Sequence, residues 1–151
     1  MSDPEILFGI YCPPHPQPLL SPDASEGYGK LRDAFETCRK RIEESEADLI
    51  LVYSTTWPSI IGHQIQGHPE PEWVHVDDDF HYLGSMPYKF KMDTEFAEKF
   101  RESAESRGLQ SRTVSYDGFP IDTGSIVALK LLNPDNRIPA CIVSSNMYAN
   151  R

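Results

Sequence analysis

The stretch Phe8-Gly-Ile-Tyr-Cys-Pro-Pro-His-Pro-Gln-Pro-Leu-Leu20 joins a short apolar run to a loop in which four prolines surround one histidine. The run Ile6–Tyr11 predicts a buried strand. Proline fixes φ and restricts the residue before it, so the loop should be stiff and extended. Binding groups of α/β proteins lie on such loops. His15 is therefore either a metal ligand or polar site residue, or an incidental histidine of a rigid turn.

A second apolar run predicts a strand parallel to the first. Between the runs, apolar residues spaced by three and four predict a helix over Lys30–Glu46. The continuous run Ala47–Tyr53 is typical of a parallel strand covered on both faces. We predict a right-handed βαβ unit in an α/β fold with a mostly parallel sheet and helices on both faces. Since parallel strands end at the same edge, His15 and the segment Ser54–Trp57 should lie close together.

Residues 60–88 form a stretch rich in His, Pro and Asp, in which only Trp73–His75 predicts a short edge strand. It contains His63 and His81 as well as three consecutive aspartates, and both residue types bind metals. Their spacing matches no zinc pattern. A solvated loop and a functional lid or partner surface are the alternatives.

The remaining chain alternates between helix and strand signals. The expected elements are a helix over Asp93–Arg107, a strand over Ser111–Tyr116, a turn-rich loop over Asp117–Gly124, a helix over Ser125–Leu132 and a strand over Arg137–Ser145. The 151 residues are enough for one domain with one core.

The composition excludes several classes of partner. A net charge of −9 argues against nonspecific binding to nucleic acid or anionic membranes. No apolar run approaches the roughly 18 residues that would indicate a membrane span. The three cysteines, Cys12, Cys38 and Cys141, form no CxxC pair, so neither a disulfide framework nor a cysteine zinc site is indicated. A reducing, cytoplasmic location fits best.

Four segments, taken in order, resemble the class III (LigB-like) extradiol ring-cleavage dioxygenases. They are Pro14-His15-Pro16, Ser54–Trp57, Asp122–Gly124 with Leu129–Pro134, and Ile138–Asn146. The resemblance covers nearly the whole chain but only about the first half of such a domain. It implies that residues 1–151 form one LigB-like α/β domain that is incomplete relative to the family.

Active members of this family hold Fe(II) with two histidines and one glutamate, which leaves three positions open for a catechol or aminophenol and for O₂. His15 corresponds to the first ligand. Thr56 stands where the second histidine is expected, and Thr123 where a further active-site histidine is expected. The glutamate belongs to the later half. The resemblance thus implies a vestigial pocket formed by His15, Thr56, Trp57 and Thr123.

The 2-aminophenol 1,6-dioxygenases of this family pair a catalytic β subunit with a homologous α subunit that has lost its metal ligands, and the two threonines resemble the α type. We therefore expect a non-catalytic subunit, with Fe(II) in a catalytic β-type partner. One alternative is an active enzyme with an altered metal site, using His15 with His63 or His81. Another is a module that binds an aromatic small molecule. A sheet ending at Val143 should expose an edge, which also predicts self-association or a partner chain.

Overall fold

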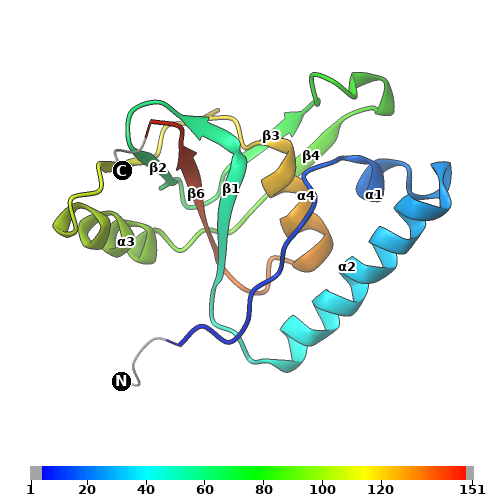
Figure 1. The fold of residues 1–151 in the computed structure, drawn as a ribbon, viewed down its shortest axis with the longest axis horizontal. Coiled ribbons are helices and arrows are strands. Elements are labelled where there is room, and N and C mark those ends of the chain that lie inside the picture. Colours follow the sequence, from blue (N-terminus) through cyan, green and yellow to red (C-terminus); the bar gives the residue numbers. More distant parts are fainter. Residues whose placement is uncertain (1–4, 149–151) are drawn as a thin grey trace.

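The computed structural model describes residues 5–148 as an α/β fold with a four-stranded sheet, in the order β1-β6-β2-β5, and a separate two-stranded sheet, β3-β4 (Figure 1). The strands are β1 (Ile50–Ser59), β2 (His63–Gln66), β3 (Glu72–His75), β4 (Met86–Lys89), β5 (Ser111–Val114) and β6 (Ala140–Asn146). The helices are α1 (Gln17–Leu20), α2 (Glu26–Glu44), α3 (Thr94–Ser106) and α4 (Thr123–Leu132), with 3₁₀ turns at Pro22–Ala24 and His81–Leu83.

The central sheet is mostly parallel, as predicted. Strand β1 runs parallel to β6, and β2 runs parallel to β5. The two pairs are joined by β2 and β6, which run antiparallel to each other and pair at one position, Ile65 opposite Val143. The bounds predicted for the second strand, Ala47–Tyr53, were wrong at both ends. Strand β1 begins at Ile50 and continues to Ser59, because it bulges after Ser54 and resumes pairing at Pro58, opposite Ser145.

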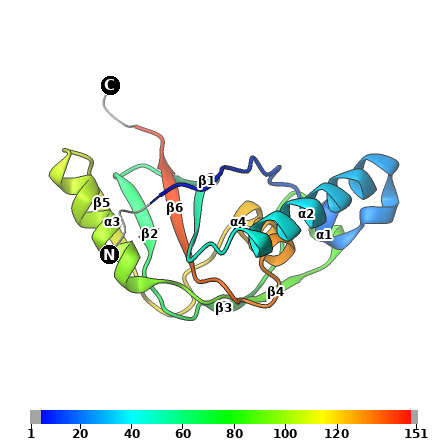
Figure 2. The ribbon, with the colours of Figure 1, turned by 90° about the horizontal axis from the view of Figure 1, so that it is seen from below.

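The predicted first strand, Ile6–Tyr11, is not a strand, and the predicted βαβ unit does not form. Phe8 and Ile10 pack on the core while Gly9 and Tyr11 are exposed, so the segment alternates as a strand would. It runs beside β1 (Figures 1 and 2), but no ladder of hydrogen bonds joins it to β1 within the described chain. The predicted burial was also wrong for Ile6 and Tyr11, which are exposed, and a strand needs backbone pairing as well as an apolar sequence.

Local capping explains where the helices begin. Ser25 accepts a hydrogen bond from the Tyr28 N–H, so α2 begins at Glu26, four residues before the predicted start. Asp93 caps α3 through the Phe96 N–H at 2.8 Å, and Asp122 caps α4. The helices predicted over Asp93–Arg107 and Ser125–Leu132 are therefore confirmed within two residues. Helices α2 and α4 lie on one side of the central sheet and α3 on the other (Figure 2).

Two apolar clusters hold these layers together, one on each face of the sheet. Strand β6 serves both, because Ile142 faces the cluster formed with α2 and α4 while Cys141 and Val143 face α3. The continuous apolar run of β6 follows from this burial on two faces.

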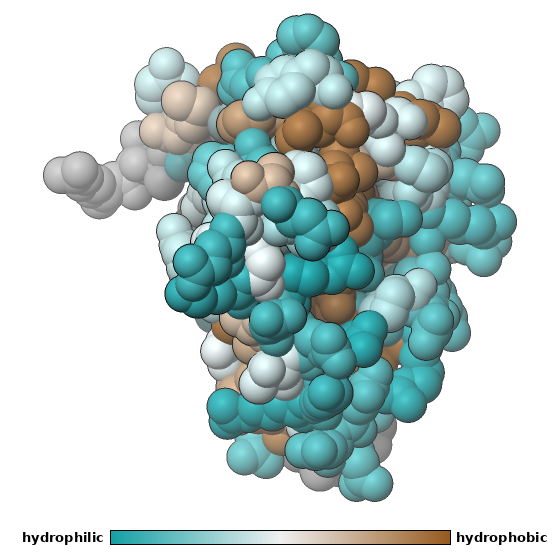
Figure 3. Space-filling view, turned by 90° about the vertical axis from the view of Figure 1, so that its right-hand side faces the viewer, coloured by the Kyte–Doolittle hydropathy of each residue, from teal (hydrophilic) through white to brown (hydrophobic). Residues whose placement is uncertain are grey.

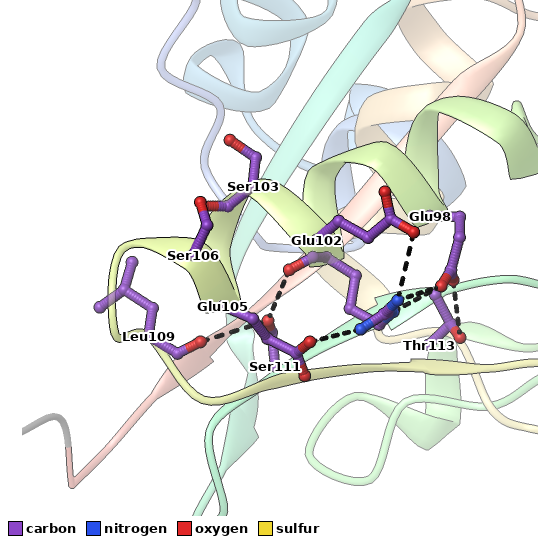
Figure 4. A network of polar contacts seen from close by, with 9 residues as sticks. Glu98, Glu102, Ser103, Glu105, Ser106, Leu109, Ser111 and Thr113 are labelled. Carbon is purple, nitrogen blue, oxygen red and sulfur yellow. Dashed lines mark hydrogen bonds and ion pairs between the residues drawn. The ribbon is translucent and has the colours of Figure 1, made fainter.

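A network of charged side chains connects α3 to β5 (Figure 4). Arg101 contacts Glu98 and Glu105 on its own helix, each at 2.5 Å. From β5, Thr113 donates to Glu98 and Ser111 donates to the Arg101 carbonyl oxygen. Exposed pairs of this kind contribute little to stability, so the network mainly orients α3 on the sheet edge.

The outer surface of α2 is mostly polar. Figure 3 shows hydrophilic side chains over the lower part of this side, where α2 lies, and hydrophobic side chains gathered near the top. Within residues 5–148, no helix is both long enough and apolar enough to cross a membrane.

Candidate functional site

Three segments that are distant in the sequence converge at the first turn of α4. A Cβ atom added to Gly124 would lie 2.6 Å from Thr56 Oγ1 and 3.0 Å from Pro14 Cβ. The loop of His15 and the end region of β1 therefore approach the same helix, as the sequence predicted. Their proximity does not arise from two paired strands, because residues 6–11 join no sheet. A glycine at position 124 permits this close approach.

The Asp122 carboxylate is the hub of the convergence. Its Oδ2 accepts hydrogen bonds from Ser54 Oγ at 2.8 Å, Thr56 Oγ1 at 2.6 Å and the Ser125 N–H at 3.0 Å. Its Oδ1 accepts from Ser125 Oγ at 2.7 Å. One side chain thus caps α4 and ties β1 to it, and the Thr56 hydroxyl proton is committed to that carboxylate.

The bulge of β1 is shaped by Ser54. Its hydroxyl oxygen accepts hydrogen bonds from the backbone N–H groups of Thr56 and Trp57, both at 3.2 Å, while its proton goes to Asp122. This local turn replaces ladder pairing over the bulge. It turns Trp57 toward Phe119, whose ring centroid is 5.5 Å from the indole.

Thr123 lies between two side chains that we did not include among the predicted site residues. Its hydroxyl donates to Asp77 Oδ2 and lies 2.9 Å from His75 Nε2. A hydroxyl has one proton, so if Asp77 receives it, His75 must donate from Nε2 to the Thr123 oxygen. His75 is the last residue of β3, and Asp77 lies two residues after it. The only sequence signal was the cluster of His and Asp in residues 60–88.

The loop after β3 also contacts His15, which remains exposed. Asp77 Oδ1 accepts the N–H groups of Asp79 and Phe80, both at 3.0 Å, and the Phe80 ring meets the His15 ring edge-on with centroids 6.0 Å apart. Partial burial acts to raise the pKa of the Asp77 carboxyl. The hydrogen bonds from Thr123 and from the two N–H groups, together with the nearby His75, outweigh it and hold that pKa below its ordinary value.

We predict that Thr123→Val lowers the free energy of unfolding by about 1 kcal/mol near neutral pH, because it removes the hydroxyl between Asp77 and His75. The depressed pKa of Asp77 means that its stabilising contribution is present above the ordinary carboxyl pKa and is lost as pH falls through the folded value. The deficit of the variant should therefore shrink in acid. Urea unfolding between about pH 2 and 6, with an NMR titration of Asp77, measures both effects.

Thr113→Val is the matched control, because the Thr113 hydroxyl also donates to a carboxylate, that of Glu98, although Thr113 is half-buried and Thr123 is buried. It should leave the Asp77 titration unchanged. An Asp77 pKa that is the same in Thr123→Val as in the wild type would contradict the assignment.

The other candidate ligands, His63 and His81, each have a ring nitrogen near a backbone carbonyl oxygen. His63, on β2, has its Nδ1 3.0 Å from the Ser144 carbonyl oxygen, and His81 has its Nδ1 3.4 Å from the Asp78 carbonyl oxygen. Across residues 5–148, no group of three or more His, Cys, Asp or Glu side chains is arranged to hold a metal ion. The Fe(II) site implied by the family does not fit the donor set near His15, because the Thr56 hydroxyl is already bonded to Asp122.

Two of the cysteines, Cys12 and Cys141, are not suited to nucleophilic chemistry. Burial, with a smaller effect from Cys38, raises the pKa of the Cys12 thiol to about 11. Burial, with a smaller effect from Asp93, raises the pKa of the Cys141 thiol to about 12. Both thiols stay protonated at neutral pH.

Comparison with known proteins identifies the same family that the four sequence segments resemble. Residues 9–151 match the family described as the catalytic LigB subunit of aromatic ring-opening dioxygenase. The chain is 30% identical over 144 residues to the 2-aminophenol 1,6-dioxygenase alpha subunit of a Pseudomonas species, covering 95% of this chain and 53% of that one. It is also 30% identical over 154 residues to the beta subunit, covering 97% of this chain and 50% of that one.

A more distant relative is the 3,4-dihydroxyphenylacetate 2,3-dioxygenase of Escherichia coli, 22% identical over 114 residues, covering 75% of this chain and 41% of that one. The chain thus spans about half the length of the curated relatives it matches. Percentage identity alone does not separate the alpha and beta types, because the chain is 30% identical to both. The match over residues 9–151 places this chain in the LigB family of aromatic ring-opening dioxygenase subunits.

Proposed function

We propose that the chain is a non-catalytic, α-type subunit of an extradiol dioxygenase that cleaves an aminophenol or a catechol. On this proposal it works in the cytoplasm beside a homologous catalytic β-type subunit. The relatives that match it over most of its length are named as alpha and beta subunits of one enzyme, which supports a role as a partner.

The observation that carries the proposal is the state of the Thr56 hydroxyl. Thr56 stands where the family's second iron-binding histidine is expected, and its oxygen donates to Asp122 at 2.6 Å. Thr123, at the further histidine position, donates to Asp77. Both side chains have become parts of hydrogen-bond networks that hold the fold together, and a neutral hydroxyl is a weaker Fe(II) ligand than imidazole.

In such an assembly, Fe(II) bound in the catalytic subunit would supply the centre that orients the aromatic substrate and O₂. The residues of this chain would have another task. The networks around Asp122 and Thr123 join β1 and the loop after β3 to α4, and Pro14 of the His15 loop lies close to the same helix at Gly124. They would present a rigid surface to the partner without taking part in ring cleavage.

We expect the purified chain to bind less than about 0.1 iron per molecule and to show no ring cleavage of 2-aminophenol, because one exposed histidine cannot complete a three-ligand site. Metal analysis after reconstitution with Fe(II) under anaerobic conditions measures the first expectation. The absorbance of the ring-opened product measures the second. Adding a catalytic β-type subunit should give activity that depends on that subunit's iron.

His15→Ala is the matched variant for this experiment and should change neither iron content nor activity of the isolated chain. Stoichiometric iron that disappears in His15→Ala would instead establish an altered metal site. A rise in melting temperature with 2-aminophenol, without turnover and without iron, would favour a small-molecule binding module.

A further inference from the structure

The two outer edges of the β3-β4 ribbon differ in whether side chains bond to their backbone groups. The outer edge of β4 is closed by side chains: Lys130 Nζ donates to the Pro87 carbonyl oxygen at 2.8 Å, and Asn136 Nδ2 donates to the Lys89 carbonyl oxygen at 2.7 Å. Pro87 itself has no N–H to offer. Edge strands protected in this way do not pair with other chains.

The outer edge of β3 has no such protection. In the antiparallel register, Glu72 lies opposite Lys89 and Val74 opposite Pro87. The Phe90 N–H bonds to the Pro71 carbonyl oxygen, so these two residues form a hydrogen-bonded pair. Bonded and non-bonded pairs alternate along an antiparallel ladder. The N–H and C=O groups of Glu72 and Val74, which belong to non-bonded pairs, therefore point away from β4. Within the described chain, neither residue's backbone has a partner on this side.

The side chains beside this free edge are apolar and exposed. Trp73 is 59% exposed and Val74 is 54% exposed, although they are consecutive and point to opposite faces. An open hollow of about 610 Å³ is lined only by residues of the ribbon, namely Glu72, Trp73, Val74, Pro87, Tyr88 and Lys89. Figure 2 shows the ribbon at the margin of the molecule, where a second chain can reach it.

We propose that β3 pairs with β3 of a second copy of this chain, antiparallel and centred on Trp73. In this register, Glu72 of one copy faces Val74 of the other, so their outward N–H and C=O groups bond reciprocally. All the unpartnered groups of both residues are then satisfied, and the two ribbons form one four-stranded sheet. This two-fold arrangement is the isologous contact typical of homodimers.

The same register also pairs the side chains. Trp73 shares a sheet face with Tyr88, its cross-strand neighbour. Centring the contact on Trp73 gives a continuous row of Tyr88, Trp73 and the same two residues of the second copy. Such aromatic cross-strand pairs stabilise sheets. The Glu72 carboxylate is 3.2 Å from Lys89 Nζ, so its charge is compensated within each copy.

The pairing uses one four-residue edge strand of each copy, whereas each partner in a standard complex buries roughly 800 Å², so the dimer should be weak and concentration-dependent. Each copy also carries a net charge of −9. Raising salt from about 0.05 to 0.5 M should therefore tighten the dimer by screening this repulsion.

Analytical ultracentrifugation of the purified chain tests the pairing. We expect the mass to rise with concentration from the 17.1 kDa monomer toward twice that value. Val74→Pro removes an N–H that β4 does not use, so it should weaken the dimer at least about tenfold and leave far-ultraviolet circular dichroism unchanged. Val74→Thr keeps the N–H and the β-branched shape, and it should dimerise like the wild type.

Hydrogen exchange gives a second readout, because the Glu72 and Val74 amides should become protected as the dimer forms. Trp73→Ser, which keeps the backbone intact, should also weaken association. A chain that stays monomeric at millimolar concentration, or a dimer that Val74→Pro does not weaken, would overturn the proposal. Neither result depends on the proposed function, since only the isolated chain is measured.

Discussion

Replacing Asp122 with alanine should lower the free energy of unfolding by about 3–4 kcal/mol. The variant loses the cap of α4 and leaves the hydroxyls of Ser54, Thr56 and Ser125 without their acceptor. Ser54 is 5% exposed and Ser125 is fully buried, so water cannot replace the carboxylate at either without rearrangement. Urea unfolding followed by circular dichroism measures the loss.

Asp93→Ala provides the matched control. Asp93 also caps a helix, but among residues 5–148 its side chain bonds only to the Phe96 N–H. Its loss should cost about 1 kcal/mol, the usual value for an N-cap. The difference between the variants isolates the contribution of the three hydroxyls around Asp122. Equal losses in Asp93→Ala and Asp122→Ala would show that Asp122 acts only as a cap.

Replacing Gly62 with alanine should cost about 3–4 kcal/mol, for a different reason. Gly62 has φ +67°, and an added Cβ would lie 2.7 Å from the Gln110 carbonyl carbon. That carbonyl also accepts the His63 N–H at 2.8 Å. Since the clashing atoms are backbone and already hydrogen-bonded, the chain cannot relax without disturbing the start of β2 and β5.

Gly118→Ala separates the cost of the positive φ from the cost of the clash with another part of the backbone. Gly118 has φ +76°, but an added Cβ there would meet nothing within 4 Å. This variant should lose only about 1 kcal/mol, the cost of a left-handed alanine. Thermal and urea unfolding of both variants measure the difference. A loss in Gly62→Ala no larger than in Gly118→Ala would rule out the close contact with Gln110 as its cause.

The elements predicted most accurately are those whose signals are local. The Asp93 side chain caps the start of α3 by accepting the N–H of Phe96, three residues later. Gly108, just after the end of the helix, has φ +79°. Helix α4 follows Asp122 in the same way. Caps and helical periodicity depend on neighbours within one or two turns, so they can be read without knowing the fold.

The failures were in the pairing of strands. Ile6–Tyr11 has the alternation of a strand, but no ladder joins it to β1. The sequence predicts only Trp73–His75 as a strand within residues 60–88, yet this stretch also contains β2 and all of β4 except Lys89. Their partners lie far along the chain, as in the pairing of His63 with Ser111, and short strands have weak periodicity. Strand identity was therefore settled by long-range contacts.

For the candidate site, the sequence by itself determined which residue types were available. The chain has His15 at the position of the family's first iron ligand, and threonines at positions 56 and 123, where the resemblance leads one to expect histidines. No coordinates are needed for this comparison. Only the tertiary structure decided what those threonines do. Thr56 donates to a residue 66 positions later, and Thr123 to one 46 positions earlier. A hydroxyl's single proton goes to whichever acceptor the fold brings within reach, and that depends on chain packing.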